Sequence, residues 1–190
     1  MDLQPGDGAR AIERLAAAGV HLLTPMPTTA EGLGLIHEVA YVEAVRTGEP
    51  RSLAGSNGFA WDPGLWKMAL SSTGGVEEAV LMALRTRGSA GSLSSGLHHA
   101  RRGEGLGYCT VNGLAVAALD LRAAGVGRVL ILDLDAHGGG GTFDILGADP
   151  RVHLADVSVN SFDSWEPTDP ARHFYYEAGE APGYLGHVED

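Results

Sequence analysis

The chain has 190 residues, a formal net charge of −11 and a hydrophobic content of 44%. This length and composition predict one globular domain over 1–190, and the negative charge argues against binding to nucleic acid. No apolar run approaches the ~20 residues that cross a bilayer, and the N-terminus does not read as a secretory signal. With Cys109 as the only cysteine, no intrachain disulfide can form, and we expect a reducing, cytoplasmic compartment.

The first half of the chain is predicted to be mostly helical. Apolar residues at helical spacing indicate helices over 9–18, 28–46 and 75–85. The segment 48–63 carries several turn signals, among them Asp62-Pro63, and we expect a loop there.

Strands and helices alternate in the second half. The pattern predicts strands over 90–93, 128–135 and 152–159, with helices over 110–124 and 142–146 between them. Such alternation is typical of an α/β fold with a mostly parallel sheet and helices on both faces. Ligands of these folds bind at the carboxyl ends of the strands.

The strand over 128–135 ends in polar residues that suit a metal ion. If the strand persists, one face carries alternate residues that change from apolar to acidic, namely Val129, Ile131, Asp133, Asp135 and His137. Two adjacent carboxylates in an apolar strand are costly unless a cation compensates their charge. Asp135 and His137 supply two of the three protein ligands of a catalytic zinc, with Asp133 behind them. The alternative is a hydrogen-bonded polar strand end without metal.

Three further features allow more than one interpretation. His98-His99 follows Gly96, and a loop there would let both rings serve one site as general acid and base; most exposed His-His pairs do nothing chemical. The glycine run 138–141 lacks the Gly-Lys-Ser/Thr ending of a phosphate-binding loop, so a tight turn beside a metal explains it better. Cys109 is a candidate nucleophile, but a small core residue is the simpler explanation.

These motifs occur together and in order, and as a set they resemble one family. Gly96-Leu97-His98-His99-Ala100 is followed by Gly107-Tyr108-Cys109 with Asn112, and then by the strand end from Asp133 to Thr142. This pattern is similar to that of the histone deacetylase and acetylpolyamine amidohydrolase family. That family has a tandem histidine, a Gly-Phe-Cys segment and an Asp-x-Asp-x-His-His-Gly-x-Gly-Thr strand end. The resemblance implies an arginase/deacetylase-like fold and zinc-dependent amide hydrolysis.

The resemblance also implies a role for each matching residue. Asp135 and His137 would bind zinc, which polarises the acetamide carbonyl and activates the attacking water. His98 and His99 would be the acid/base pair, and Asp133 would hydrogen-bond His98.

Two further sites follow from the same resemblance. Asp133 would also lie near a structural potassium ion, to which Ser158 on the next strand would contribute. Gly107 and Tyr108 would line the acyl-lysine channel, where the family usually has phenylalanine at the position of Tyr108.

The chain departs from the family pattern in three ways. Gly138 replaces the second histidine of the strand end, and the family's third zinc ligand and carbonyl-polarising tyrosine have no counterpart. Tyr184 comes too early to be that tyrosine, and the spacing of Asp156 and Asp163 does not support either as the third ligand. We therefore expect 1–190 to be a truncated deacetylase-like domain, incomplete at its C-terminus, that is poorly active alone and prone to associate.

Three other functions are alternatives to the deacetylase. An arginase-like ureohydrolase needs aspartate at position 139, where the chain has Gly139. A non-catalytic scaffold would fit the absent third ligand, and a nucleotide-binding α/β domain is the weakest option. The expected substrates are acetylated lysine peptides or acetylpolyamines, with no nucleic acid or membrane partner; the oligomeric state stays open.

Overall fold

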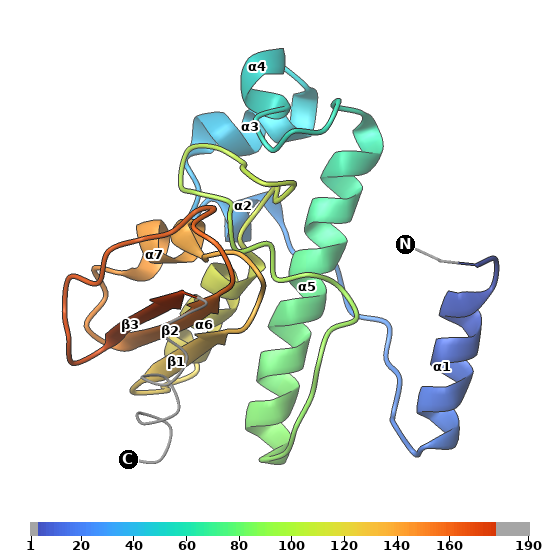
Figure 1. Cartoon of the computed structure of the whole chain (residues 1–190). Coiled ribbons are helices and arrows are strands. Elements are labelled where there is room, and N and C mark those ends of the chain that lie inside the picture. Colours follow the sequence, from blue (N-terminus) through green and yellow to red (C-terminus); the bar gives the residue numbers. More distant parts are fainter. Residues whose placement is uncertain (1–3, 178–190) are drawn as a thin grey trace.

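The computed structural model describes residues 4–177, which form helices and a three-stranded sheet (Figure 1). The helices are α1 (Asp7–Ala17), α2 (Ala30–Leu33), α3 (Val39–Thr47), α4 (Arg51–Ala54), α5 (Pro63–Thr86), α6 (Gly113–Ala123) and α7 (Gly140–Leu146). The strands are β1 (Val129–Asp133), β2 (Val152–Ser158) and β3 (His173–Glu177). None of the helices in this described part is long and apolar enough to cross a membrane.

The sheet is parallel throughout, in the order β1-β2-β3, which confirms the predicted α/β class. Val129 pairs with Val152 and Asp133 with Asp156 in its register. One face packs into the main core against α6 and α7, through residues such as Val152, Leu154, Val116 and Ile145. On the opposite face of β1, Leu130 and Leu132 are 64% and 49% exposed. The core face therefore carries the acidic side chains of β1 and β2 inward.

Helix α5 is longer than its sequence pattern predicts. The predicted loop over 48–63 contains the short helix α4, and the predicted helix over 75–85 is only the second half of α5. Asp62 caps α5 by accepting a hydrogen bond from the backbone N–H of Gly64, and Pro63 occupies the first turn. Asp62-Pro63 is thus a helix start, since proline is favoured at the first helical position. Figure 1 shows α5 running beside α6, whereas α1 stands apart from the rest.

The single helix predicted over 28–46 is wrong, because α2 ends at Leu33 and α3 begins at Val39. Between them His37 is buried and bridges two loop segments. Its Nδ1 lies 2.8 Å from the carbonyl oxygen of Arg101, and its Nε2 accepts a hydrogen bond from the backbone N–H of Asn112. These tertiary bonds outweigh the helical propensity of the segment.

Two strand predictions need correction. The segment 90–93 is not a strand; Ser92 and Ser94 hydrogen-bond each other there, and Leu93 is exposed. Strand β1 ends at Asp133 rather than at residue 135. Asp135 and His137 therefore lie in the turn after β1 and do not continue the alternation of one strand face.

Candidate catalytic site

The tandem histidines lie in a loop that Asn112 holds in place. Asn112 caps α6 through its Oδ1, which accepts a hydrogen bond from the N–H of Ala115 at 3.1 Å. Its Nδ2 donates to the carbonyl oxygens of His98 and Ala100 at 3.3 and 3.2 Å, and to the hydroxyl of Thr142. All these groups are buried. One side chain thus ties the histidine loop to α6 and α7.

His98 and His99 face each other beside the end of β1. His98 Nδ1 lies 2.6 Å from Asp133 Oδ2, and the two Nε2 atoms are 3.1 Å apart. Both rings are buried. If His98 donates its Nδ1 proton to Asp133, a hydrogen bond between the two Nε2 atoms needs one ring to carry a second proton. The arrangement therefore suits a pair that holds and passes one proton.

The charges around His98 favour its protonated form. Burial by itself lowers the pKa of His98, but the hydrogen bond to Asp133 and the negative charges of Asp133, Asp135 and Asp156 raise this pKa overall. Burial raises the pKa of Asp156, against the opposing effect of its hydrogen bond from Gly139. The site thus combines one readily protonated histidine with several carboxylates at the carboxyl ends of β1 and β2.

Asp135 and His137 occupy the exposed turn next to this pair. Their side chains are 54% and 45% exposed, and Asp135 Oδ1 lies 3.2 Å from His137 Nδ1 and 3.7 Å from His98 Nε2. Two atoms bound to one tetrahedral zinc at about 2.0–2.2 Å lie about 3.3 Å apart, so this oxygen and nitrogen fit two zinc positions. Within residues 4–177, no cluster of three or more His, Cys, Asp or Glu side chains has metal-site geometry.

Asp163 belongs to this site. From the sequence it is a candidate only for a third zinc ligand, and its spacing does not support that role. Its Oδ2 lies 2.9 Å from His99 Nδ1, and its other carboxylate oxygen pairs with the guanidinium of Arg101. The carboxylate of Asp156 is engaged elsewhere, since its Oδ2 accepts hydrogen bonds from Gly139 N–H and Trp165 Nε1. The one signal for Asp163 was its place just after β2, where ligands of parallel sheets collect.

An aromatic ring and Gly107 lie against His99. Gly107 has a φ of +53°, and a Cβ there would come within 2.6 Å of His99 Cδ2 and 3.0 Å of Phe162. The ring of Phe162 lies 5.0 Å from that of His99 and 5.4 Å from that of His137. Tyr108 is 65% exposed, and its ring lies 5.1 Å from that of Phe59. Phe59 and Phe162 carried no distinguishing sequence signal.

The predicted potassium residues lie on adjacent strands. Ser158 is buried, and its hydroxyl contacts Tyr175 at 2.8 Å and the carbonyl oxygen of Asn160 at 3.1 Å. Asp133 instead bonds His98 and the backbone N–H of Asp135. Asp133 and Ser158 therefore make hydrogen bonds to different groups of the protein. Cys109, the alternative nucleophile, is buried in the core.

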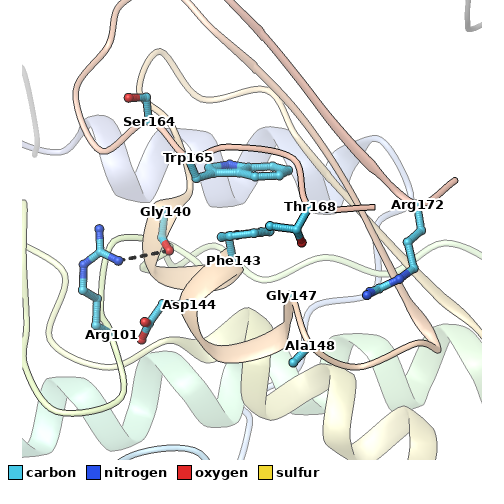
Figure 2. Close-up of a pocket in the computed structure, with 10 residues that line it drawn as sticks. All are labelled: Arg101, Gly140, Phe143, Asp144, Gly147, Ala148, Ser164, Trp165, Thr168 and Arg172. Carbon is cyan, nitrogen blue, oxygen red and sulfur yellow. Dashed lines mark hydrogen bonds between the residues drawn. The ribbon is translucent and has the colours of Figure 1, made fainter. Parts of the chain in front are cut away.

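A separate hollow of about 520 Å³ lies beside α7 (Figure 2). Figure 2 shows Phe143 and Trp165 stacked at its centre, with Arg101 and Arg172 on either side. The rings of Phe143 and Trp165 are 4.4 Å apart. Neither histidine of the tandem pair lines this hollow, so it is distinct from the site around His98 and His99.

Comparison with known proteins adds family evidence. A family model described as the histone deacetylase domain matches residues 4–184. An uncharacterised protein of Picosynechococcus sp. is 38% identical over 122 residues, covering 63% of this chain and 40% of its own length. The acetylpolyamine amidohydrolase of Mycoplana ramosa is 34% identical over 132 residues, covering 69% of this chain and 34% of its own length. This chain thus spans less than half the length of these curated relatives.

A solved structure, the crystal structure of the HDA15 HD domain, has a similar fold. Its TM-score is 0.68 at 28% sequence identity, and the match covers 84% of this chain and 50% of that one. The likeness extends the agreement from sequence to three-dimensional arrangement.

Proposed function

The chain belongs to the histone deacetylase family, and from this premise we propose that it carries the acid/base half and two metal ligands of a zinc-dependent amide hydrolase. The substrates would be acetylated lysine side chains or acetylated polyamines. The reaction would cleave the acyl amide with water, releasing acetate and the free amine. Activity, metal and substrate are proposed from the family and from the geometry of this site.

One observation carries the proposal: a buried pair of histidines, bonded to a carboxylate, faces a carboxylate and an imidazole that share an exposed turn. His98 Nε2 and His99 Nε2 are 3.1 Å apart, and Asp135 Oδ1 lies 3.7 Å from His98 Nε2. A proton acceptor is thus held within a few ångströms of the proposed metal ligands. Hydrolysis of an amide needs this combination, because water must lose a proton and the leaving amine must gain one.

The residues would act as follows. When bound by Asp135, His137 and a third ligand from outside residues 4–177, zinc would supply Lewis acidity toward the amide carbonyl and the attacking water. An Nε2 atom of the histidine pair would take the proton of the water, and the pair would return a proton to the leaving nitrogen. Asp133 would hold His98 in position and stabilise its charged form.

Two further elements belong to the same proposal. Gly107, Tyr108 and Phe162 would form walls around the acyl-amine chain, with Tyr108 at the exposed entrance. A potassium ion near Asp133 and Ser158 would support the end of the sheet. The formal net charge of −11 favours substrates that carry positive charge, such as lysine-rich peptides or polyamines.

A non-catalytic scaffold is the second candidate function. It is favoured by the exposure of Asp135 and His137, whose side chains bond each other and are each about half exposed. An arginase-like ureohydrolase is disfavoured, because a Cβ at Gly139 would come within 2.8 Å of Asp133 Oδ2. Such enzymes need an aspartate at that position.

The test is amide hydrolysis by the zinc-supplemented chain, with an acetyl-lysine peptide and an acetylated polyamine as substrates. We expect His99→Ala to lower kcat by about 10²–10⁴-fold, whereas the exposed His21→Ala serves as the matched control and keeps full activity. Turnover that survives His99→Ala would exclude the proposed mechanism. Binding of zinc and acetyl-lysine without any turnover would favour the scaffold.

A further inference from the structure

We propose that Asp163 is the positioning residue for His99, and that it reaches this role by filling the space left by the missing side chain of Gly140. The role of His99 in catalysis rests on the proposed function. The placement of His99 by Asp163 stands on the contacts of these residues alone.

The first support is the set of contacts that Asp163 makes. Its side chain is 1% exposed, and its Oδ2 lies 2.9 Å from His99 Nδ1. The same oxygen accepts a hydrogen bond from the backbone N–H of Gly141 at 3.3 Å, while Oδ1 pairs with Arg101. A carboxylate buried this deeply must be ion-paired or hydrogen-bonded, and the bonds to Arg101 and Gly141 fix the carboxylate with Oδ2 against His99.

The second support is the fit between Asp163 and the glycine run after β1. A Cβ at position 140 would overlap the Asp163 carboxylate and lie only 2.6 Å from its carbonyl oxygen. A Cβ at position 138 would lie 2.7 Å from the same carbonyl oxygen. Glycine at these two positions therefore makes room for Asp163.

The third support is the backbone of Asp163 itself. It has a φ of +54°, in the left-handed region that few residues other than glycine adopt. Backbone hydrogen bonds fix it on both sides, from Gly138 N–H to the carbonyl of Phe162 and from Gly140 N–H to the carbonyl of Asp163. Aspartate is among the residues that tolerate this conformation, and such outliers gather at functional sites.

The consequence is a symmetric histidine pair. Asp133 bonds Nδ1 of His98, and Asp163 bonds Nδ1 of His99, so that both Nε2 atoms point toward each other. With its Nδ1 proton in the hydrogen bond to Asp163, His99 keeps Nε2 as its proton-accepting nitrogen beside His98. Under the proposed function, this nitrogen would take the proton of the attacking water. Without that carboxylate, the ring is free to rotate and to take the other tautomer.

The direct test is nuclear magnetic resonance of the histidine ring nitrogens in the 15N-labelled chain without metal. We expect a strongly deshielded Nδ1 proton on His99, assigned by its loss in His99→Gln. Asp163→Asn should remove or shift this signal, because an amide can donate into Nδ1 and reverse the tautomer. Asp149→Asn is the matched control, since Asp149 also pairs with an arginine, Arg122, but lies away from the histidines. A His99 signal unchanged by Asp163→Asn overturns the proposal.

Space at position 140 gives a second, independent test. Gly140→Ala should displace Asp163 and weaken the same Nδ1 signal, whereas Gly127→Ala, where a Cβ meets no atom within 4 Å, should not. Thermal unfolding monitored by circular dichroism identifies any variant that fails to fold. If Gly140→Ala folds and keeps the His99 signal, the space argument is wrong.

The kinetic readout separates this inference from the proposed function. On the active protein, Asp163→Asn should lower kcat by about 10²–10⁴-fold with KM nearly unchanged, as expected for a group that orients a catalytic base. A normal kcat in Asp163→Asn would refute the role of Asp163. If the native chain shows the His99–Asp163 signal but no turnover, the proposed function fails and the placement of His99 stands.

Discussion

The buried histidine pair and the turn after β1 are neighbours that are built in different ways. His98 and His99 are buried, and each ring bonds a carboxylate that is fixed from several sides. Asp135 and His137 are about half exposed and bond mainly to each other. Within residues 4–177, both rings of the proposed proton-transfer pair thus have carboxylate partners, whereas the exposed turn supplies two proposed metal ligands. The two parts should respond differently to substitution.

The largest effect on stability should come from Asn112, which anchors the buried part. Asn112→Ala removes the α6 cap and leaves the carbonyl oxygens of His98 and Ala100 without this donor. We expect a loss of about 2–4 kcal/mol in the free energy of unfolding, measured by urea denaturation. Asn160→Ala, which removes one exposed hydrogen bond to Phe162, should cost no more than about 0.5 kcal/mol. Equal losses in the two variants would contradict the anchoring role.

The next effect should come from Asp133 and should depend on pH. Because the pKa of His98 is raised above 6.5 in the fold, its protonation stabilises the native state. This contribution is fully present below the unfolded pKa and is lost as pH rises through the folded pKa. We expect Asp133→Asn to cost about 1.5–3 kcal/mol at about pH 6 and less at about pH 9. Urea denaturation of the metal-free protein at both pH values checks this, and a cost independent of pH would contradict it.

Substitutions in the exposed turn should hardly affect folding. Asp135→Ala and His137→Ala should change the free energy of unfolding by less than about 0.5 kcal/mol. The same variants should weaken zinc binding by about 100-fold or more, measured by competition with a chromophoric chelator. A large loss of stability in either variant would show that the turn contributes to folding, as the buried histidine pair does. Unchanged zinc affinity would remove Asp135 and His137 as ligands.

The smallest effect concerns the thiol of Cys109, whose reactivity reports how well the core excludes solvent and reagents. Burial raises the pKa of its thiol to about 11, so little reactive thiolate exists near neutral pH. We expect Ellman's reagent to label the native chain far more slowly than free glutathione at about pH 8, and urea to restore fast labelling. Rapid labelling of the folded protein would show that the interior opens readily.

Local patterns predicted the parts of the fold that depend on neighbouring residues. The parallel strands and helix α6 follow from alternation and helical spacing. The contact of His98 with Asp133 was instead implied by the family resemblance, and the structure contains it. The break between α2 and α3 does not follow from local patterns, because it depends on His37 bonding to Arg101 and Asn112, which are distant in sequence. Asp62-Pro63 locally predicts a turn, and the prediction is wrong because the same pair also suits a helix start.

The site shows the same division. The spacing of Asp135 and His137 predicts two metal ligands, and the structure keeps these two side chains together even though β1 ends before them. The contact of Asp163 with His99 was missed, since nothing local links a residue after β2 to the tandem histidines. The second face of β1 was expected to be covered, but Leu130 and Leu132 are exposed among the described residues. Terminal features such as Tyr184 lie outside those residues.

The overlap between a side chain at 140 and the body of Asp163 has a consequence for variation. The two positions behave as one coupled choice, because a Cβ at one excludes the observed placement of the other. A library that randomises both codons and selects for folded, active protein should recover glycine at 140 whenever it recovers aspartate at 163. Pairs with a larger residue at 140 should survive only with a rebuilt loop. Selection would thus act on the pair of residues. Substituting either position alone would make that position look less tolerant of change than it is when both vary together.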